Sequence, residues 1–422
     1  MRGFFKVTGI LLVNLCLLIG LYLGAAAIFH QLNDGKSWFE QAKVQRFDKN
    51  LVRATYPNYQ KFEPATALAI FEEYYQPTTA YRPFVGYRRN GFKGSVVNIL
   101  EDSGFRISTN HAIDNSVWFF GGSSMWGTGA TDSTTIPSLY ASKTGEQVLN
   151  LGESGYNSLQ ELAQLNIMLA RGLRPAKVVF YDGFNDSYYH CQRNIPIPSH
   201  AFDLQFRDIV QNHALQALEG EDVRKQVTRS LKPSEFLSTY LKTNYASEVD
   251  FLLAPLIYAT KSETPEQDIQ AGPTVSDKPI SQFNRSQTYH HCDETQQAEK
   301  AANVLVSSWL AVHSILKDRN IPVHFVLQPA ATYHPEKYNL NYLTDYDKQR
   351  IVDEADSYKG FTKAVMDAWQ ERCVAQSACD ALVDMSKLFF DDSTPVFIDS
   401  VHLSPNGNQK VVDALLAAIS EG

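Results

Sequence analysis

The sequence lacks an excess of basic residues. Its 422 residues include 38 Lys and Arg against 46 Asp and Glu, which gives a formal net charge of -8 at pH 7. The basic residues are scattered along the chain and form no dense basic segment. Nucleic-acid binding depends on such a concentration of positive charge. We therefore expect no nucleic-acid partner and no other polyanionic partner.

Internal repeats and low-complexity tracts are also missing. Hydrophobic residues make up 44% of the chain and charged residues 20%, which is typical of a folded globular protein rather than a disordered one. The length is sufficient for one large domain with additions, or for two domains.

Cysteine is scarce, with five residues in the chain. Four of them, Cys191, Cys292, Cys373 and Cys379, lie beyond the N-terminal apolar segment. An even number of cysteines in an oxidising compartment predicts two disulfides. The local pair Cys373 with Cys379 leaves Cys191 with Cys292 as the simplest of the three possible connectivities.

A metal site is the alternative for two of these cysteines. His190 precedes Cys191, and His290 and His291 precede Cys292, so the two segments hold two thiols and three imidazoles. Their spacing is not that of a closed zinc site, and an exported chain favours oxidation of the thiols. We therefore expect disulfides, no metal and no other cofactor.

Residues 1–29 read as a transmembrane signal anchor. Arg2 and Lys6 precede a nearly unbroken apolar run, Val7 to Phe29, that is long enough to cross the hydrocarbon core of a membrane. A cleaved signal peptide is the alternative, because Ala25-Ala26-Ala27 offers the small residues of a cleavage site. Either interpretation exports the rest of the chain, and the anchor interpretation places it on the periplasmic or extracellular side of the membrane.

Residues 30–115 are expected to form an N-terminal extension that packs on the core. The segment from Tyr81 to Gly91 within it is rich in aromatic, arginine and turn residues. It either packs over the main sheet or lines a binding face, for instance by stacking on sugars.

From residue 116 the chain alternates between strand and helix patterns. Such alternation predicts a parallel sheet with helices on both faces. A capping box of Ser158 and Glu161 and a capping Ser404 before Pro405 are expected to begin two of the helices. The expected strands are Val117 to Phe120, Gln147 to Leu151, Lys177 to Tyr181, Val323 to Leu327 and Val396 to Ile398. The expected helices are Thr135 to Thr144, Leu159 to Ala170, the stretch from Ala301 to Leu316, and Val411 to Ile419.

The alternation stops between residues 190 and 292. Loops of this length are usually functional lids or inserted subdomains, and we expect an inserted lid or subdomain here. Its apolar run, Phe251 to Tyr258, is either a hydrophobic lid or the core of a buried helix. The main domain then consists of residues 116–189 and 293–422.

Polar residues suited to acyl transfer follow the expected strands. Ser123 could serve as nucleophile, His402 as its general base and Asp399 as the carboxylate that orients the imidazole. The backbone N–H groups of Ser123 and Gly155 and the side-chain amide of Asn185 could stabilise an oxyanion. Because parallel strands present their carboxyl ends at one edge, we expect these residues to meet there.

These segments resemble the blocks that define the SGNH, or GDSL, hydrolase superfamily. The resemblance implies a flavodoxin-like three-layer α/β/α fold with a central parallel sheet, and the same roles for the residues named above. The chain departs from the family pattern at Gly122, where the family has aspartate. The matching blocks are Gly121-Gly122-Ser123 with Gly127, the segment with Gly155, Gly183-Phe184-Asn185-Asp186, and Asp399-Ser400-Val401-His402.

Two other known glycine-rich motifs fit the turn around Ser123 less well. An α/β-hydrolase elbow would have glycine two residues after the nucleophile, where this chain has Met125. A phosphate-binding loop would be followed by lysine, which this turn lacks.

The leading hypothesis is an exported, membrane-anchored serine esterase that acts through an acyl-Ser123 intermediate. Its expected substrate is an acylated carbohydrate or a lipid. The alternatives are an O-acyltransferase that moves acetyl groups to or from an extracellular polysaccharide, and a catalytically silent glycan-binding protein on the same fold. The sequence predicts contact with the membrane through the N-terminal helix and identifies no protein partner.

Overall fold

The computed structural model describes residues 49–191, 200–201, 292–390 and 392–421. The predicted anchor and nearly all of the predicted insertion, including the apolar run 251–258, lie outside these residues. In the part of the chain that is described, no helix has the length and hydropathy needed to cross a membrane.

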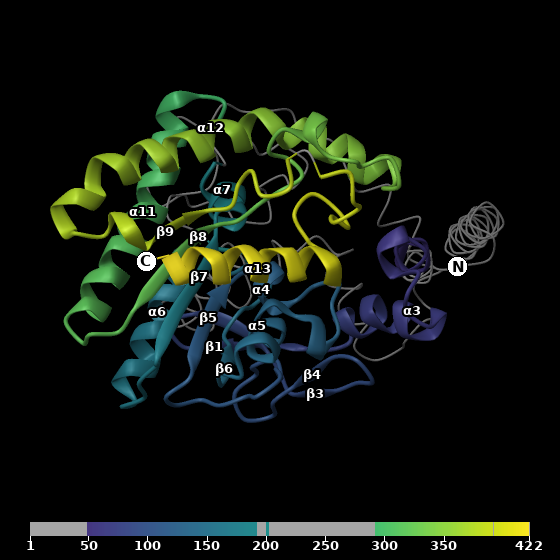
Figure 1. Ribbon diagram of the computed structural model, residues 1–422, viewed down its shortest axis with the longest axis horizontal. Helices are drawn as coiled ribbons and strands as arrows, with labels where there is room; N and C mark the ends of the chain where they lie inside the picture. Colours follow the sequence, from purple (N-terminus) through teal and green to yellow (C-terminus); the bar gives the residue numbers. More distant parts are fainter. Residues whose placement is uncertain (1–48, 192–199, 202–291, 391, 422) are drawn as a thin grey trace, which may run out of the picture. The chain divides into compact units, whose positions relative to one another are not determined.

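A five-stranded sheet forms the centre of the domain (Figure 1). All neighbouring strands are parallel, and β5 pairs with β7 from Val117 opposite Lys177 to Gly121 opposite Tyr181. The spatial order 2-1-3-4-5 is that of flavodoxin-like folds. In that order the strands are β6 (Val148–Asn150), β5 (Val117–Gly121), β7 (Lys177–Asp182), β8 (Val323–Leu327) and β9 (Leu382–Asp384).

Helices cover both faces of this sheet. Side chains alternate along β5, so that Trp118 and Phe120 enter one core, whereas Val117 and Phe119 enter the other. The two cores make three layers, which confirms the predicted α/β/α fold class. The first core is covered by α6 (Ser158–Ala170), α11 (Thr295–Lys317) and α12 (Asp345–Gln376), and the second by α5 (Ile136–Thr144) and α13 (Pro405–Glu421).

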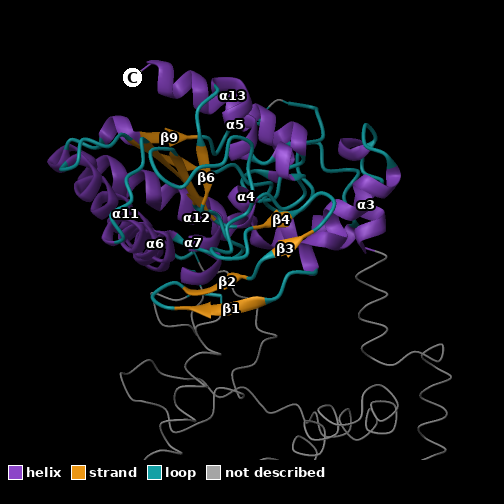
Figure 2. Ribbon diagram, turned by 90° about the horizontal axis from the view of Figure 1, so that it is seen from below, coloured by secondary structure: helices purple, strands orange, loops and turns teal. Residues whose placement is uncertain are grey.

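The first part of the described N-terminal extension packs against the second core. Tyr56, Tyr59, Ile70 and Phe71 are buried there together with residues of α5 and α13. Figure 2 shows the two small hairpins of this segment on the side of the domain where α4 and α7 lie. The elements here are α3 (Pro64–Glu72), β1 (Thr79–Arg82), β2 (Gly86–Arg89), β3 (Phe92–Lys93) and β4 (Asn98–Ile99), and the two short helices are α4 (Ser123–Trp126) and α7 (Phe184–His190).

The fifth strand is not the expected one. Val396 to Ile398 is a buried loop, closed by hydrogen bonds from Ile398 N to His402 O (2.9 Å) and from Ser404 N to Val396 O (2.8 Å), and β9 takes the edge of the sheet instead. A short apolar run is buried equally well in a loop or in a strand, so the pattern does not separate the two.

One helix was not predicted, and the start of another was misplaced. The unpredicted helix is α12, whose long sequence is rich in charged residues although Ile351, Tyr358 and Phe361 are buried along it. The N-cap of α6 is Asn157, which accepts a hydrogen bond from Gln160 N, rather than Ser158, whose hydroxyl donates to Asp186 instead. Ser404 does cap α13, by accepting a hydrogen bond from Gly407 N.

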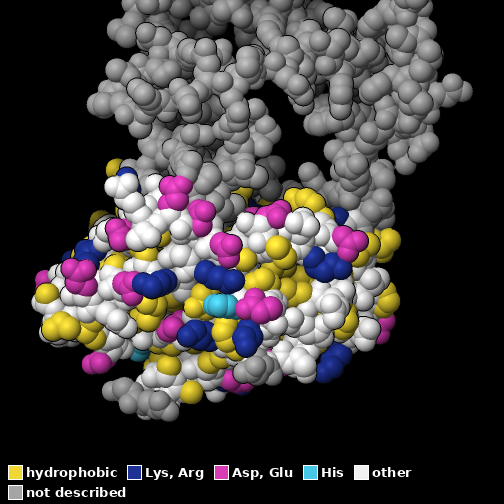
Figure 3. Space-filling model, turned by 90° about the horizontal axis from the view of Figure 1, so that it is seen from above, with side chains coloured by type: hydrophobic (Ala, Val, Ile, Leu, Met, Phe, Trp, Pro, Cys, Tyr) yellow, Lys and Arg dark blue, Asp and Glu magenta, His cyan; other side chains and the backbone are white. Residues whose placement is uncertain are grey.

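Disulfides join Cys191 to Cys292 and Cys373 to Cys379, in the expected pairs. The first bond consumes both thiols that the alternative metal site would have needed. On the face shown in Figure 3, basic, acidic and hydrophobic side chains are interspersed, which matches the scattered charges of the sequence.

Candidate active site

Ser123 is placed where the central strand turns into a short helix. β5 ends at Gly121, Gly122 is extended, and Ser123 is the first residue of α4. N–H groups in the first turn of a helix have no partner within the helix, so the N–H of Ser123 is not used by α4 itself. The Ser123 hydroxyl lies 2.7 Å from Nε2 of His402.

His402 and Asp399 lie on one tight loop before α13. Nδ1 of His402 lies 2.9 and 2.8 Å from the two carboxylate oxygens of Asp399. The spacing Asp-x-x-His also lets Oδ1 of Asp399 accept the backbone N–H groups of Val401 (3.1 Å) and His402 (2.9 Å). The structure thus brings Ser123, His402 and Asp399 into one hydrogen-bonded chain with the geometry of a serine hydrolase triad.

Asp399 is held in its charged form. Burial would raise its pKa, but His402, through its charge and hydrogen bonds, and the charge of Arg53 together keep the pKa well below its ordinary value. Nδ1 of His402 therefore faces a carboxylate, which fixes the tautomer with the proton on Nδ1 and leaves Nε2 to accept the proton of Ser123.

Asn185 and Gly155 lie on two segments beside Gly122 and Ser123. Asn185 is the second residue of α7, and its side-chain amide donates a hydrogen bond to Tyr156 O at 2.6 Å. Each amide has two N–H donors, so the second one is available for an oxyanion. Gly155 has φ +78°, a left-handed conformation that favours glycine.

Gly155 is also confined by two tyrosines. A Cβ at this position would lie 2.6 Å from the hydroxyl of Tyr87 and 3.1 Å from that of Tyr189. Tyr87 donates from its hydroxyl to Ser154 O at 2.7 Å, which ties the loop to β2. The absence of a side chain at position 155 therefore permits the close approach of the N-terminal extension.

Two arginines of β2 hold the same loop. Arg88 donates to the carbonyls of Leu151 (3.0 Å) and Gly152 (3.3 Å). Arg89 binds the Glu153 carboxylate through its backbone N–H (2.9 Å) and its guanidinium (2.5 Å). Both arginines and Glu153 are buried, so the loop that carries Gly155 is fixed by buried ionic and polar contacts.

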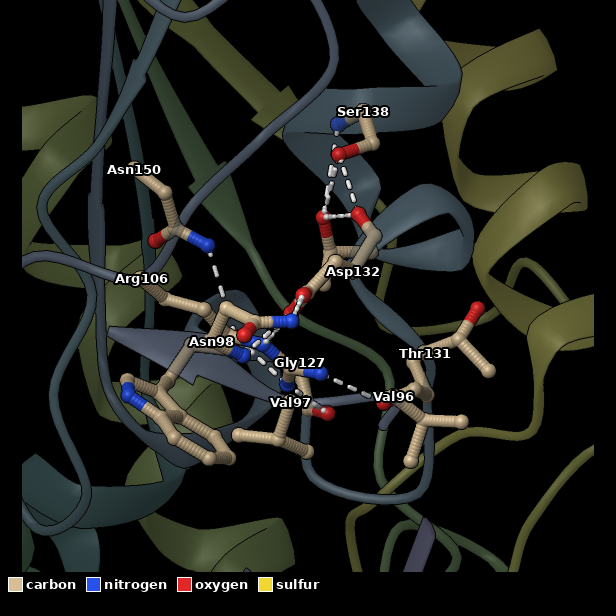
Figure 4. Close-up of polar contacts among 12 residues, drawn as sticks. Val96, Val97, Asn98, Arg106, Gly127, Thr131, Asp132, Ser138 and Asn150 are labelled. Carbon is tan, nitrogen blue, oxygen red and sulfur yellow. Dashed lines mark hydrogen bonds and ion pairs between the residues drawn. The ribbon is translucent and has the colours of Figure 1, made fainter. Parts of the chain in front are cut away.

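A third arginine holds the far end of the nucleophile helix (Figure 4). Arg106 is fully buried and donates to the carbonyls of Gly127 and Ala130, both at 2.6 Å, and to that of Trp126 at 3.2 Å. Its Nε pairs with Asp132 at 3.0 Å. C-terminal helix carbonyls lack intrahelical partners, and Arg106 supplies donors for this region, which anchors α4 below Ser123.

These arginines were not identified from the sequence. Arg53, Arg88, Arg89 and Arg106 are the buried arginines among the described residues, and each contacts a loop of the candidate site. For Arg88 and Arg89, the clustering of arginine and tyrosine between residues 81 and 91 was the available signal. The side chains of Tyr87, Arg88 and Arg89 are directed into the domain. This segment therefore packs on the main domain, as one of the two interpretations predicted, and these three residues do not form a sugar-binding face.

A group of buried acids lies behind Asn185. Glu161, Asp182 and Asp186 are all buried, Trp309 donates from Nε1 to Asp182 (2.8 Å), and Ser158 donates from its hydroxyl to Asp186 (2.6 Å). Burial raises the pKa of all three acids, and repulsion by Asp182 raises those of Glu161 and Asp186 further.

No protein-family model and no curated protein sequence matches the chain. Among solved structures, it is similar to a protein of Desulfitobacterium hafniense described as lipolytic and of the G-D-S-L family, with 9% identity over 72% of this chain and 99% of that one, at a TM-score of 0.31. An acetyl xylan esterase shows 14% identity over 72% and 98% of the two chains, at a TM-score of 0.32. Phospholipase A1 of Streptomyces albidoflavus shows 12% identity over 73% and 100%, also at a TM-score of 0.32.

Strand order and site geometry lead to one conclusion about the fold. The sheet has the 2-1-3-4-5 order, and the nucleophile, oxyanion and Asp-x-x-His segments follow its strands or pack beside them at the carboxyl edge. On these features of its own structure, the chain has a flavodoxin-like three-layer α/β/α fold, with the site segments placed as the resemblance to SGNH/GDSL hydrolases implies.

Proposed function

We propose that this protein is an exported, membrane-anchored serine esterase that acts through an acyl-Ser123 intermediate. The observation that carries the proposal is the continuous chain of hydrogen bonds from the Ser123 hydroxyl through His402 to Asp399. A serine hydroxyl becomes an effective nucleophile when an oriented base accepts its proton.

The reaction follows from this arrangement. Ser123 Oγ attacks the ester carbonyl while Nε2 of His402 takes the hydroxyl proton, and the developing oxyanion is bound by the N–H groups of Ser123 and Gly155 and by Asn185. His402 then gives its proton to the departing alcohol, which leaves Ser123 acylated. Water then attacks the acyl carbon while His402 takes one of its protons. His402 returns that proton to Ser123 Oγ as the bond between Oγ and the acyl carbon breaks, which releases the acid and free Ser123.

An acylated carbohydrate is the substrate class that we favour, with a lipid as the second. In support, two tyrosines of α7 pack edge-on against each other, with 5.1 Å between the ring centroids of Tyr188 and Tyr189, and the Tyr189 hydroxyl lies beside Gly155. Tyr188 and Tyr189 are only partly buried. Aromatic rings with a polar end suit the alternating apolar and hydroxylated faces of sugars.

A fluorophosphonate probe tests the proposal. The folded protein should be labelled at Ser123, and Ser123→Ala should abolish labelling. Ser124→Ala is the matched control, because Ser124 is the next residue of α4 while Nε2 of His402 lies against the hydroxyl of Ser123. The Ser124→Ala variant should be labelled like the unaltered protein. Unlabelled folded protein would contradict the esterase proposal and favour the glycan-binding alternative.

Incubation with an acyl donor and candidate glycans separates hydrolysis from transfer. Release of free acid with no acylated glycan is expected for an esterase. Accumulation of acylated glycan would show that a sugar hydroxyl replaces water in the second step, which is the transferase alternative.

A further inference from the structure

Arg53 reaches the triad from the N-terminal extension. One guanidinium nitrogen of Arg53 lies 3.1 Å from Oδ2 of Asp399 and 3.5 Å from Oδ1 of Asp347. The side chains of Arg53, Asp399 and Asp347 are only 8%, 12% and 3% exposed. A cation is thus buried between two carboxylates, one of which belongs to the candidate triad.

The contact completes the set of donors around Asp399. Its Oδ1 accepts the backbone N–H groups of Val401 and His402, while Oδ2 receives Nδ1 of His402 at 2.8 Å and the guanidinium of Arg53. With donors on both oxygens, the carboxylate cannot rotate without breaking at least one buried hydrogen bond, which is costly. Its plane, and with it the direction of the imidazole, is fixed.

Asp347 in turn fixes Arg53. Thr344 is the N-cap of α12, its hydroxyl donates to Oδ2 of Asp347 (2.8 Å), and it accepts from Asp347 N (3.1 Å). The backbone N–H of Thr344 donates to the hydroxyl of Tyr56, which lies on the same segment as Arg53. The start of α12 and the N-terminal extension are therefore tied together at the point where Arg53 meets Asp399.

We propose that Arg53, held by Asp347, is a positioning residue that orients Asp399 toward His402 and tunes the charge that the imidazole experiences. This inference rests on the proposed esterase function. The charges of Asp347, Arg53 and Asp399 alternate in sign toward His402. Arg53 therefore places a positive charge beside the carboxylate that His402 contacts, and Asp347 offsets part of that charge.

The other titratable groups near Asp347, Arg53 and Asp399 keep the same charge across the pH range of the assay. Burial lowers the pKa of Arg53, but the charges of Asp399 and Asp347 raise it by more. Arg53 therefore stays protonated. Arg350 on α12 is held charged by Glu354, and burial is the main cause that raises the pKa of the nearby tyrosines. Those tyrosines are Tyr56, Tyr59 and Tyr342, and Tyr75 also lies near Arg53.

The test compares charge variants by the pH dependence of p-nitrophenyl acetate hydrolysis. Arg53→Met should lower kcat with little change in KM and move the acid limb of the profile upward, by about half a pH unit or more. Asp347→Asn should move the same limb downward, because Arg53 then acts without its counter-charge. In Arg53→Lys, which keeps the positive charge, the acid limb should lie close to that of the unaltered protein.

Lys348→Met is the matched control. Lys348 pairs with the exposed Asp345 on the same helix as Asp347, so its removal should leave the acid limb in place. If Arg53→Met fails to fold, the opposite predictions for Asp347→Asn and the control still decide the matter.

Two outcomes separate this inference from the proposed function. If the fluorophosphonate probe does not label the unaltered folded protein, the esterase proposal itself is overturned. The positioning role alone would be overturned if the unaltered protein is labelled normally but the acid limb stays in place in Arg53→Met or in Asp347→Asn. It would also be overturned if the acid limb moves in the same direction in both variants.

Discussion

The side-chain amide of Asn185 lies where a side chain at position 122 would have to be. A Cβ on Gly122 would lie 2.1 Å from Nδ2 of Asn185 and 3.3 Å from Tyr156 O, the carbonyl to which Asn185 donates. The SGNH pattern has aspartate at this position, whereas the glycine in this chain leaves room for the Asn185 amide.

Gly122→Ala is expected to displace Asn185 rather than unfold the domain. Because the nearest atom belongs to the end of a side chain, the amide can shift, and loss of one oxyanion donor costs about 10²-fold or more in kcat. The melting temperature should change little. Hydrolysis of p-nitrophenyl acetate and a thermal melt measure the two effects.

A double variant checks the mechanism of that loss. If Gly122→Ala acts only through the amide, the pair Gly122→Ala with Asn185→Ala should be no slower than Asn185→Ala alone. Full kcat in Gly122→Ala, or additive losses in the pair, would show that the two residues are not coupled.

Arg89→Met is expected to weaken both stability and catalysis. The substitution leaves the buried Glu153 without its ionic partner, and breaking a buried pair in this way costs roughly 3–5 kcal/mol. The loop that carries Gly155 also loses its tie to β2, so kcat should fall in the folded enzyme. Urea unfolding and p-nitrophenyl acetate hydrolysis report the two effects.

Lys143→Met provides the comparison for Arg89→Met. Lys143 pairs with Asp413 on the surface, and its loss should cost less than about 1 kcal/mol without an effect on kcat. Equal urea midpoints for the Arg89 and Lys143 variants would mean that burial of the Arg89 pair contributes no stability.

Local patterns explain why the nucleophile and its base could be predicted. The turn after β5 and the Asp-x-x-His segment each lie within a few residues, and the alternation of strands and helices predicts that such turns share one edge of the sheet. Ser123 lies at that edge for this reason, whereas Asp399 and His402 follow the buried loop at residues 396–398 rather than a strand and still meet Ser123.

Contacts between distant segments explain what could not be predicted. Arg53 and Asp399 are 346 residues apart in the chain, and Arg89 and Glu153 are 64 apart. A single arginine in a sequence gives no sign of which carboxylate it will meet. The edge strand β9 has only three residues, too few for its pattern to stand out from the buried loop at residues 396–398.

The two disulfides should differ in their contribution to stability. Cys191 and Cys292 are 101 residues apart, whereas Cys373 and Cys379 are 6 apart. In the chain-entropy model, closing the longer loop stabilises by about 4.7 kcal/mol and the shorter one by about 2.4 kcal/mol. Replacement of Cys191 and Cys292 together by alanine should therefore lower the urea midpoint more than the same change at Cys373 and Cys379. An equal or smaller effect would contradict the loop-length argument for this protein.

The buried acids behind Asn185 should make the protein less stable as pH rises. Burial raises the pKa of Asp182 to about 6 and that of Asp186 to about 8, and it raises the pKa of Glu161 as well. The unfolded chain releases these protons near pH 4, so between about pH 4 and 8 the folded state holds more protons than the unfolded state. These groups therefore remove stability progressively over that range.

Glu161→Gln should reduce this loss, because it removes one buried acid at nearly constant shape. His324 acts in the opposite direction, since burial lowers its pKa to about 4. The measurement is therefore the difference in unfolding free energy between Glu161→Gln and the unaltered protein at pH 5, 6.5 and 8, in which the histidine contribution cancels. The difference should move in favour of the variant as pH rises, by at most about 1.4 kcal/mol per pH unit for one proton. Asp345→Asn, at a fully exposed site, should show no such trend, and a constant difference for Glu161→Gln would mean that Glu161 is already ionised at pH 5 in the folded protein.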